Sequence, residues 1–255
     1  MEKQYFIIIY LTIFGICILH AQSTKGYHLV WSDEFNEASL DTSSWSYETG
    51  QNGWGNNELE DYTYGKNVQV KNGYLSIIAR KENSQYTSGR ICTRDKRVFT
   101  YGLVEIRAKL PWGTGTWPAL WMLGADEKTV GWPSCGELDI MEHVGKQPGY
   151  IHCSLHDLSG YGATPYTGVI YLKNPFTRYH LYAMEWTKQY IRYFVDGHVV
   201  YEYNPAQKTA ANWPFDKPFY FIFNIAIGGG WGGPKVDDTI FPQTMKVDYV
   251  RIYQK

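Results

Sequence analysis

The chain has 255 residues, with 24 Lys and Arg against 25 Asp and Glu, so its formal net charge is −1. That balance argues against a nucleic-acid-binding surface, which would be basic and clustered. Hydrophobic residues make up 44% of the chain, which excludes an extensively disordered protein. Aromatic residues at 17%, together with 25 Gly, favour short strands and tight turns over a helical bundle.

The N-terminal residues are typical of a targeting segment. A nearly continuous apolar run covers residues 5–19, and Ala21 offers a small residue for cleavage. The run is short for a helix that spans a membrane, and no second run of its length follows. We therefore expect a secretory signal peptide at residues 1–21, a secreted or periplasmic domain at residues 22–255, and no membrane span. Lipoprotein anchoring through Cys17 is the alternative.

Short strand patterns recur through the remaining chain. Residues 104–110 alternate apolar and charged side chains, as in a strand with one buried face. Residues 190–195 and 198–203 flank Asp196-Gly197, which predicts a hairpin with a type I′ turn. No window has a helical period over three turns. Further strands are expected at residues 75–80, 117–123, 138–144, 150–155, 181–187, 219–227 and 246–253.

These patterns predict one all-β domain. We found no long linker, internal repeat or charge run that would divide the chain. Many short strands separated by Gly and Pro turns are typical of sandwiches and barrels. We expect a β-jelly roll sandwich of two curved antiparallel sheets, whose concave face offers a cleft.

One predicted strand carries an unusual group of acids. Glu137 and Asp139 are two residues apart and share a face. A regular strand would turn Glu142 away, but a β-bulge at Ile140-Met141 would return it to that face. Clustered carboxylates raise one another's pKa, which suits glycoside hydrolysis, where one acid attacks and a protonated one donates. An acidic strand edge facing solvent or a cation site would give the same pattern.

The sequence of residues 137–142, ELDIME, resembles the E-[IL]-D-[IV]-x-E signature of glycoside hydrolase family 16. The form with one inserted residue resembles that of its laminarinase-like β-1,3-glucanases. The resemblance covers residues 27–255 and implies a concanavalin A-like jelly roll. Other motifs that resemble the family, in its order, lie at residues 31–35, 55–59, 62–63, 88–90, 101–102, 117–123, 224–229 and 247–253.

The resemblance implies roles for the acids. Glu137 would be the nucleophile, Glu142 the acid/base, and Asp139 would tune the pair by hydrogen bonding. A short gap between carboxyl groups on one strand fits a retaining enzyme, in which they lie roughly 5–5.5 Å apart. His156 lies where the family often places a histidine near the reactive sugar, although a structural histidine is the alternative.

Substrate-binding residues are expected around the acids. The resemblance implies that Asn57 and Arg90 bind sugar hydroxyls. Trp117 and Trp121 are four residues apart and share a strand face, where they could stack on sugars or pack in the core. Trp231 lies in a glycine-rich loop, where a position at the cleft rim is expected. Trp54 and Trp132 also fall in predicted loops and could border the cleft.

The resemblance also implies a structural calcium ion, with no cofactor for catalysis. Glu34, Gly73 and Asp248 match the family's ligand positions, and their oxygen donors suit calcium.

The cysteines beyond the leader are odd in number and cannot all pair. Either Cys92, Cys135 and Cys153 are all small buried residues, or two of them form a disulfide and the third is a free thiol.

Together these features predict a secreted, monomeric, retaining endo-β-1,3-glucanase that hydrolyses laminarin-type β-glucans. A family relative that acts on mixed-linkage β-glucan, agar, porphyran or carrageenan is the first alternative. Arg90 is the main cation near the cleft motifs, which disfavours sulfated carrageenan. A transglycosylase is a further alternative. The presence of both Glu137 and Glu142 disfavours a non-catalytic β-glucan-binding protein.

Overall fold

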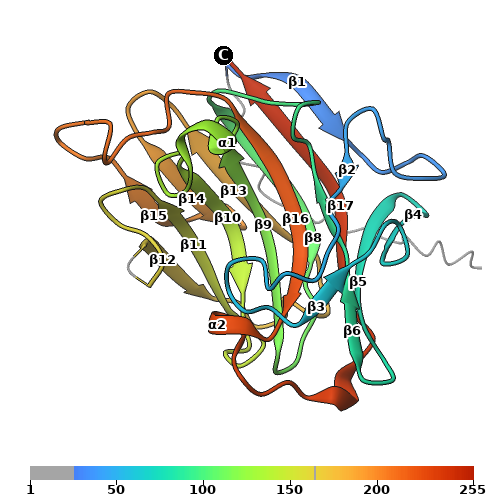
Figure 1. Ribbon diagram of the computed structural model, residues 1–255. Coiled ribbons are helices and arrows are strands. Elements are labelled where there is room, and N and C mark those ends of the chain that lie inside the picture. Colours follow the sequence, from blue (N-terminus) through green and yellow to red (C-terminus); the bar gives the residue numbers. More distant parts are fainter. Residues whose placement is uncertain (1–25, 164) are drawn as a thin grey trace, which may run out of the picture.

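The computed structural model describes residues 26–163 and 165–255 (Figure 1). The predicted signal peptide at residues 1–21 and Cys17 lie outside these residues. In the described part, two β-sheets pack face to face, and only short helices interrupt the strands. None of the helices found there is long and apolar enough to cross a membrane. The predicted all-β jelly roll is confirmed.

The larger sheet has ten strands. Its order is β15-β14-β13-β8-β17-β5-β6-β3, while β1 pairs with β17 and β4 with β5. All pairs in it are antiparallel except β3 with β6. The strands are β1 (His28–Asp33), β3 (Glu60–Tyr62), β4 (Val68–Lys71), β5 (Tyr74–Glu82), β6 (Gln85–Ser88), β8 (Gly102–Lys109), β13 (His180–Trp186), β14 (Ile191–Val195), β15 (His198–Tyr203) and β17 (Gln243–Gln254).

The smaller sheet has seven strands, all antiparallel, and its outer face carries the site described below. Its order is β12-β11-β10-β9-β16-β7-β2. The strands are β2 (Ser46–Tyr47), β7 (Arg90–Cys92), β9 (Thr116–Gly124), β10 (Glu137–His143), β11 (Tyr150–His156), β12 (Tyr166–Tyr171) and β16 (Phe219–Ile227).

Helices are short in the described part, as the lack of a helical period predicts. They are α1 (Glu127–Val130), α2 (Gly229–Gly232) and the 3₁₀ turn η1 (Asp238–Ile240). The expected hairpin is formed by β14 and β15. Asp196 and Gly197 both have positive φ, 48° and 79°, which agrees with the predicted type I′ turn.

The core lies between the sheets, and β16 shows how the sequence encodes it. Every residue of this strand is buried. Phe219, Phe221 and Phe223 point into the main core. The alternate residues Tyr220 and Ile222 pack in a smaller cluster on the other face of the same sheet. Because most of both faces is covered, the strand is apolar except at Asn224 and does not alternate.

Candidate active site

The predicted bulge in β10 is confirmed by the strand register. Asp139 pairs with Ser154 of β11, and Glu142 pairs with His152, so β10 has one residue more than its neighbour. The same shift occurs against β9. Ile140 and Met141 are both fully buried in the core between the sheets. Two consecutive residues therefore face the core, and the following glutamate returns to the outer face.

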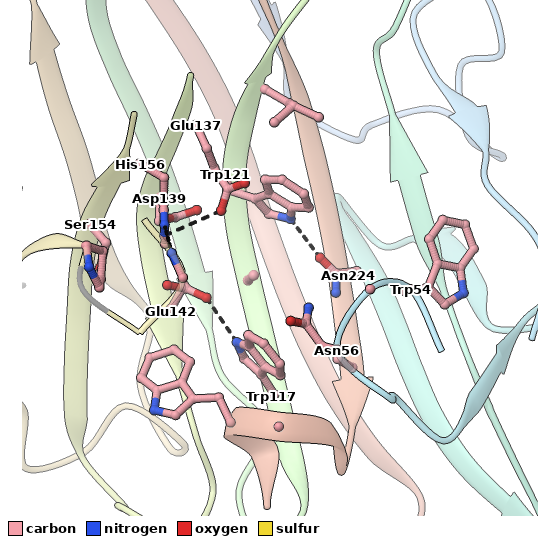
Figure 2. Close-up of a pocket in the computed structure, with 18 of the residues that line it drawn as sticks. Trp54, Asn56, Trp117, Trp121, Glu137, Asp139, Glu142, Ser154, His156 and Asn224 are labelled. Atoms are coloured by element: carbon pink, nitrogen blue, oxygen red, sulfur yellow. Dashed lines mark hydrogen bonds and ion pairs between the residues drawn. The ribbon is translucent and has the colours of Figure 1, made fainter. Parts of the chain in front are cut away.

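Glu137, Asp139 and Glu142 line a cleft on the outer face of the smaller sheet, with a volume of about 1010 Å³. Figure 2 shows the three carboxyl groups side by side with the tryptophans of β9. The size is that of an extended ligand site. Of the predicted binding residues, the structure brings Arg90, Trp117, Trp121, His156 and Trp231 into the same lining, and also Trp54 and Trp132.

Each glutamate accepts a hydrogen bond from a different indole. Trp132 Nε1 donates to Glu137 Oε2 at 2.8 Å, and Trp117 Nε1 donates to Glu142 Oε1 at 3.0 Å (Figure 2 shows the latter). Both bonds favour the ionised carboxylate. The predicted cleft tryptophans therefore hold the acids as well as walling the cleft.

Burial acts in the opposite direction on all three acids. It raises the pKa of Glu137 to about 8, with a further contribution from the nearby charge of Asp139. It raises the pKa of Glu142 to about 7, against the bond from Trp117. It raises the pKa of Asp139 well above the usual range, and the charge of Glu142 adds to this effect. The cluster therefore holds protons at a pH where exposed carboxyl groups have lost theirs.

His156 completes the acid cluster. Its Nε2 lies 3.2 Å from Asp139 Oδ2 and 3.6 Å from Glu137 Oε1. The backbone N–H of Gly162 donates to its Nδ1 at 3.1 Å. In the neutral ring, Nε2 consequently carries the proton and lies beside the carboxyl groups.

The ligand atoms of Glu137, Asp139 and His156 all lie within 4.8 Å of one another, close enough to surround a metal ion. A metal would need the lone pair of His156 Nε2, however, and the bond from Gly162 assigns the proton to that nitrogen. The arrangement therefore fits proton sharing among acids better than metal binding.

On the β9 side of the acids, the cleft wall is built around Arg90. Its guanidinium lies 4.7 Å from the Trp54 ring centroid and 5.0 Å from that of Trp121. Its Nε donates to Glu48 Oε2 at 2.6 Å. The pair is largely buried, so Arg90 is held as a rigid, charge-neutralised part of the wall.

A hydrogen-bonded chain continues from this wall, and sequence reasoning missed most of it. Trp121 Nε1 donates to Asn224 Oδ1, and Asn224 Nδ2 donates to Tyr62 Oη (Figure 2 shows the first bond). The Tyr62 hydroxyl donates in turn to Glu58 Oε2, while Asn56 Nδ2 donates to Glu58 Oε1. Glu58 thus links a loop to the cleft floor. The only signal for it was its place in the loop motif at residues 55–59.

The sequence analysis assigned sugar binding to Asn57, but the residue that lines the cleft is its neighbour Asn56. Asn57 does not line the cleft, whereas Asn56 does. The backbone fixes this choice, because Asn57 has a φ of 56° and the Asn56 carbonyl accepts from the N–H of Gly230. Because loop residues follow no strand alternation, the sequence does not predict which of the two adjacent asparagines faces the cleft.

Trp231 also lines the cleft. This residue lies in α2 instead of the expected flexible loop. Its ring contacts that of Trp117 edge-on at 5.4 Å and that of His152 at 4.9 Å. Its ring therefore joins the cleft wall beside Trp117, and a role at the cleft rim stays a prediction.

The residues expected to bind calcium have other partners. Both carboxylate oxygens of Glu34 accept from Arg251, at 2.8 and 2.7 Å. Asp248 Oδ2 accepts from Arg107 at 2.5 Å. The oxygen donors suit calcium, but an ion would have to displace both arginines, so the site is not preformed. Calcium binding at Glu34, Gly73 and Asp248 stays a prediction.

Of the two cysteine arrangements, the structure has the one without a disulfide. Cys92, Cys135 and Cys153 are all free and buried. Burial raises the pKa of Cys92 to about 11 and that of Cys135 to about 12, so both thiols are unreactive near neutral pH.

A jelly roll whose cleft joins two partly buried glutamates to a wall of tryptophans defines a polysaccharide-cleaving glycoside hydrolase. Comparisons with known proteins agree. Residues 56–251 match glycosyl hydrolases family 16. The chain belongs to this family and is a glycoside hydrolase.

Several relatives share most of the chain. It is 46% identical to a beta-glucanase of Rhodothermus marinus over 91% of this chain and 88% of that protein. It is 40% identical to glucan endo-1,3-beta-glucosidase A1 of Niallia circulans, over 90% of this chain but 38% of the longer relative. The crystal structure of a laminarinase from Flavobacterium sp. UMI-01 superposes with a TM-score of 0.87 at 51% identity, covering 89% of this chain and all of that one.

Proposed function

We propose that this chain is a secreted, retaining endo-β-1,3-glucanase that hydrolyses laminarin-type β-glucans. The observation that carries the proposal is the bulge in β10, which brings Glu137 and Glu142 to one buried cleft. The beta-glucanase and laminarinase relatives support the substrate class. Secretion rests on the apolar leader at residues 5–19.

In the first step, a Glu137 carboxylate oxygen attacks the anomeric carbon. The bond from that carbon to the glycosidic oxygen breaks, and the oxygen takes the electron pair together with the proton of Glu142. In the second step, ionised Glu142 removes a proton from water, whose oxygen attacks the same carbon. Glu137 leaves as a carboxylate, and the product keeps the β configuration.

This two-step reaction requires Glu142 to start protonated and Glu137 to start ionised. Asp139 is only 2% exposed, and burial together with the charge of Glu142 raises its pKa well above the usual range. The hydrogen bond between the two carboxyl groups raises the pKa of Glu137 and lowers that of Asp139, whereas the bond from Trp132 lowers the pKa of Glu137. Burial holds the pKa of Glu142 at about 7 and that of Glu137 at about 8, and the ionised Glu137 that attacks is the form that the bond from Trp132 stabilises.

An uncharged glucan fits the cleft better than a sulfated one. Arg90 is the only Lys or Arg among the described residues that line the cleft, and it already pairs with Glu48. The acids in the lining would repel sulfate groups. They are Glu58, Glu127, Glu137, Asp139 and Glu142.

The proposal is tested with purified protein on laminarin, barley β-glucan, agarose and κ-carrageenan at equal concentration. We expect laminarin to release reducing sugar fastest, with β-anomer formed first in proton NMR. Agarose or carrageenan outpacing laminarin would overturn the substrate, and an initial α-anomer would overturn the mechanism.

Two variants test the roles of the acids. Glu137→Gln keeps the side-chain volume and removes the attacking charge, so turnover should be lost with the melting temperature retained. Glu142→Ala should lower turnover by about 10²–10⁴-fold. Azide should partly restore it on substrates with good leaving groups, because azide attacks the glycosyl-enzyme without a general base. Near-normal activity of Glu137→Gln would remove it as nucleophile.

A further inference from the structure

The smaller sheet continues beyond the enclosed cleft on one side of the catalytic strand. β10 lies between β9 and β11, and β12 forms the sheet edge beyond β11 (Figure 1). On the β9 side, the floor holds Trp121 and the buried Arg90. On the β11 side, the lining includes His152, Ser154 and His156 of β11, Thr167 of β12, and Gly162, Ala163 and Pro165 of the loop between these strands. A polysaccharide that crosses β10 must leave over β11 and β12.

Exposed aromatic side chains lie on the outer face of these two strands, at the start of β11 and the end of β12. Tyr150 is two residues before the cleft-lining His152, so it shares the outer face. Tyr171 is four residues after the cleft-lining Thr167 and is directly paired with Tyr150, with ring centroids 5.3 Å apart. Val169 lies on the same face, opposite His152. These side chains are 48%, 59% and 49% exposed for Tyr150, Tyr171 and Val169.

The chemistry of this surface matches an uncharged sugar chain. Tyrosine rings offer flat apolar area with a hydroxyl at the edge, which suits the alternating apolar and polar faces of glucose. The surface is continuous with the cleft, since His152 lies between Val169 and Trp231. Exposed apolar groups in such a position are typical of ligand-binding surfaces.

We propose that Tyr150, Val169 and Tyr171 form an exit platform that binds the β-glucan chain beyond the enclosed cleft. The platform holds long substrates and does not touch the reacting sugar. It thereby favours polymeric glucan over short oligosaccharides. The inference rests on the proposed function, since it assumes that a glucan crosses β10.

The test compares the double variant Tyr150→Ala/Tyr171→Ala with the wild type on polymeric laminarin and on laminaritetraose. Loss of two ring contacts should lower kcat/KM on the polymer about five- to tenfold, through KM. The value for laminaritetraose should stay within about twofold of the wild type, because the short chain binds inside the cleft. In a Glu137→Gln background, the dissociation constant for laminarin should rise by the same factor.

Two control variants accompany it. Tyr150→Phe/Tyr171→Phe keeps the rings and should restore polymer activity. Val199→Ala removes a side chain that is also 59% exposed, but on β15 of the other sheet, and should change nothing. Equal losses on both substrates, or no loss on either, would overturn the platform. A wild type inactive on laminarin would instead overturn the proposed function.

Discussion

At the scale of single residues, each catalytic glutamate accepts a hydrogen bond from its own indole N–H group. Trp117 donates to Glu142 and Trp132 to Glu137, while burial opposes ionisation of both. Removing one indole N–H should therefore raise the pKa of the glutamate that it bonds and leave the pKa of the other glutamate largely unchanged. Trp121, whose N–H is bound by Asn224, offers a control of the same residue type in the same strand.

Trp117→Phe should move the basic limb of the pH–activity profile upward. Glu142 donates a proton only while protonated, so kcat/KM falls as the pH rises through the upper apparent pKa of the two coupled glutamates, whose values are about 7 and 8. Without the bond from Trp117 the ionised form is less stable and this pKa rises by about half to one unit. Trp121→Phe should raise KM and leave the limb in place. An unmoved limb in Trp117→Phe would show that the bond does not control Glu142.

At the scale of elements, a bulge and a turn fix the positions of charged groups. The bulge of β10 turns Glu142 outward while Ile140 and Met141 remain in the core. The turn between β14 and β15 holds Asp196 at a φ of 48°. From there its carboxylate contacts His180 Nδ1 at 2.6 Å and accepts the N–H of Leu181 at 2.9 Å.

This turn should make stability depend on pH. The bond from Asp196 raises the pKa of His180, so the stabilisation is present below the unfolded histidine pKa and is lost as the pH rises through the folded one. Burial tends to raise the pKa of Asp196, but bonds from His180 and Leu181 lower it overall. The stabilisation that Asp196 contributes is present above the pKa of an aspartate in the unfolded chain. It is lost as the pH falls through the lower pKa that Asp196 has in the folded protein. The pair therefore stabilises most between about pH 4 and 6.5.

Asp196→Asn should reduce the free energy of unfolding by about 1 kcal/mol at pH 5.5 and by less at pH 8. Asparagine tolerates positive φ and can still accept from Leu181, so the turn should persist. Asp196→Ala should lose stability at both pH values. Urea unfolding at the two pH values measures the difference. An equal loss for Asp196→Asn at both would contradict the role of the charge.

At the scale of the whole molecule, the cleft is assembled from distant parts of the chain. Glu58, Tyr62 and Asn224 meet Trp121 only because β16 lies beside β9 and the early loop folds over them. Likewise, Arg107 and Arg251 reach the carboxylates for which the sequence suggested a calcium ion.

The calcium prediction has a direct test in the melting temperature. An ion that binds only the folded state stabilises it, so a chelator should lower the melting temperature by a few degrees. Asp248→Ala should abolish that response. Equal melting with and without chelator would contradict calcium binding and leave the arginines as the partners of Glu34 and Asp248.

The sequence by itself determined the features that depend on local pattern. Residues 198–203 and 219–227 are strands with the predicted bounds, since the Asp196-Gly197 turn marks the start of the first and a long apolar run marks the second. The bulge at Ile140-Met141 was also readable, because three acids can share a face in no other way. Their roles as nucleophile and acid/base stay predictions.

Only the tertiary structure decided what depends on contacts between distant residues. β2, β3 and β7 have two or three residues, too few to show a period, and form because longer strands pair with them. The choice of Asn56 over Asn57 follows from a loop backbone held by Gly230. Hydrogen bonds and ion pairs of this kind join groups whose separation in the sequence has no fixed period, so no local pattern could predict them.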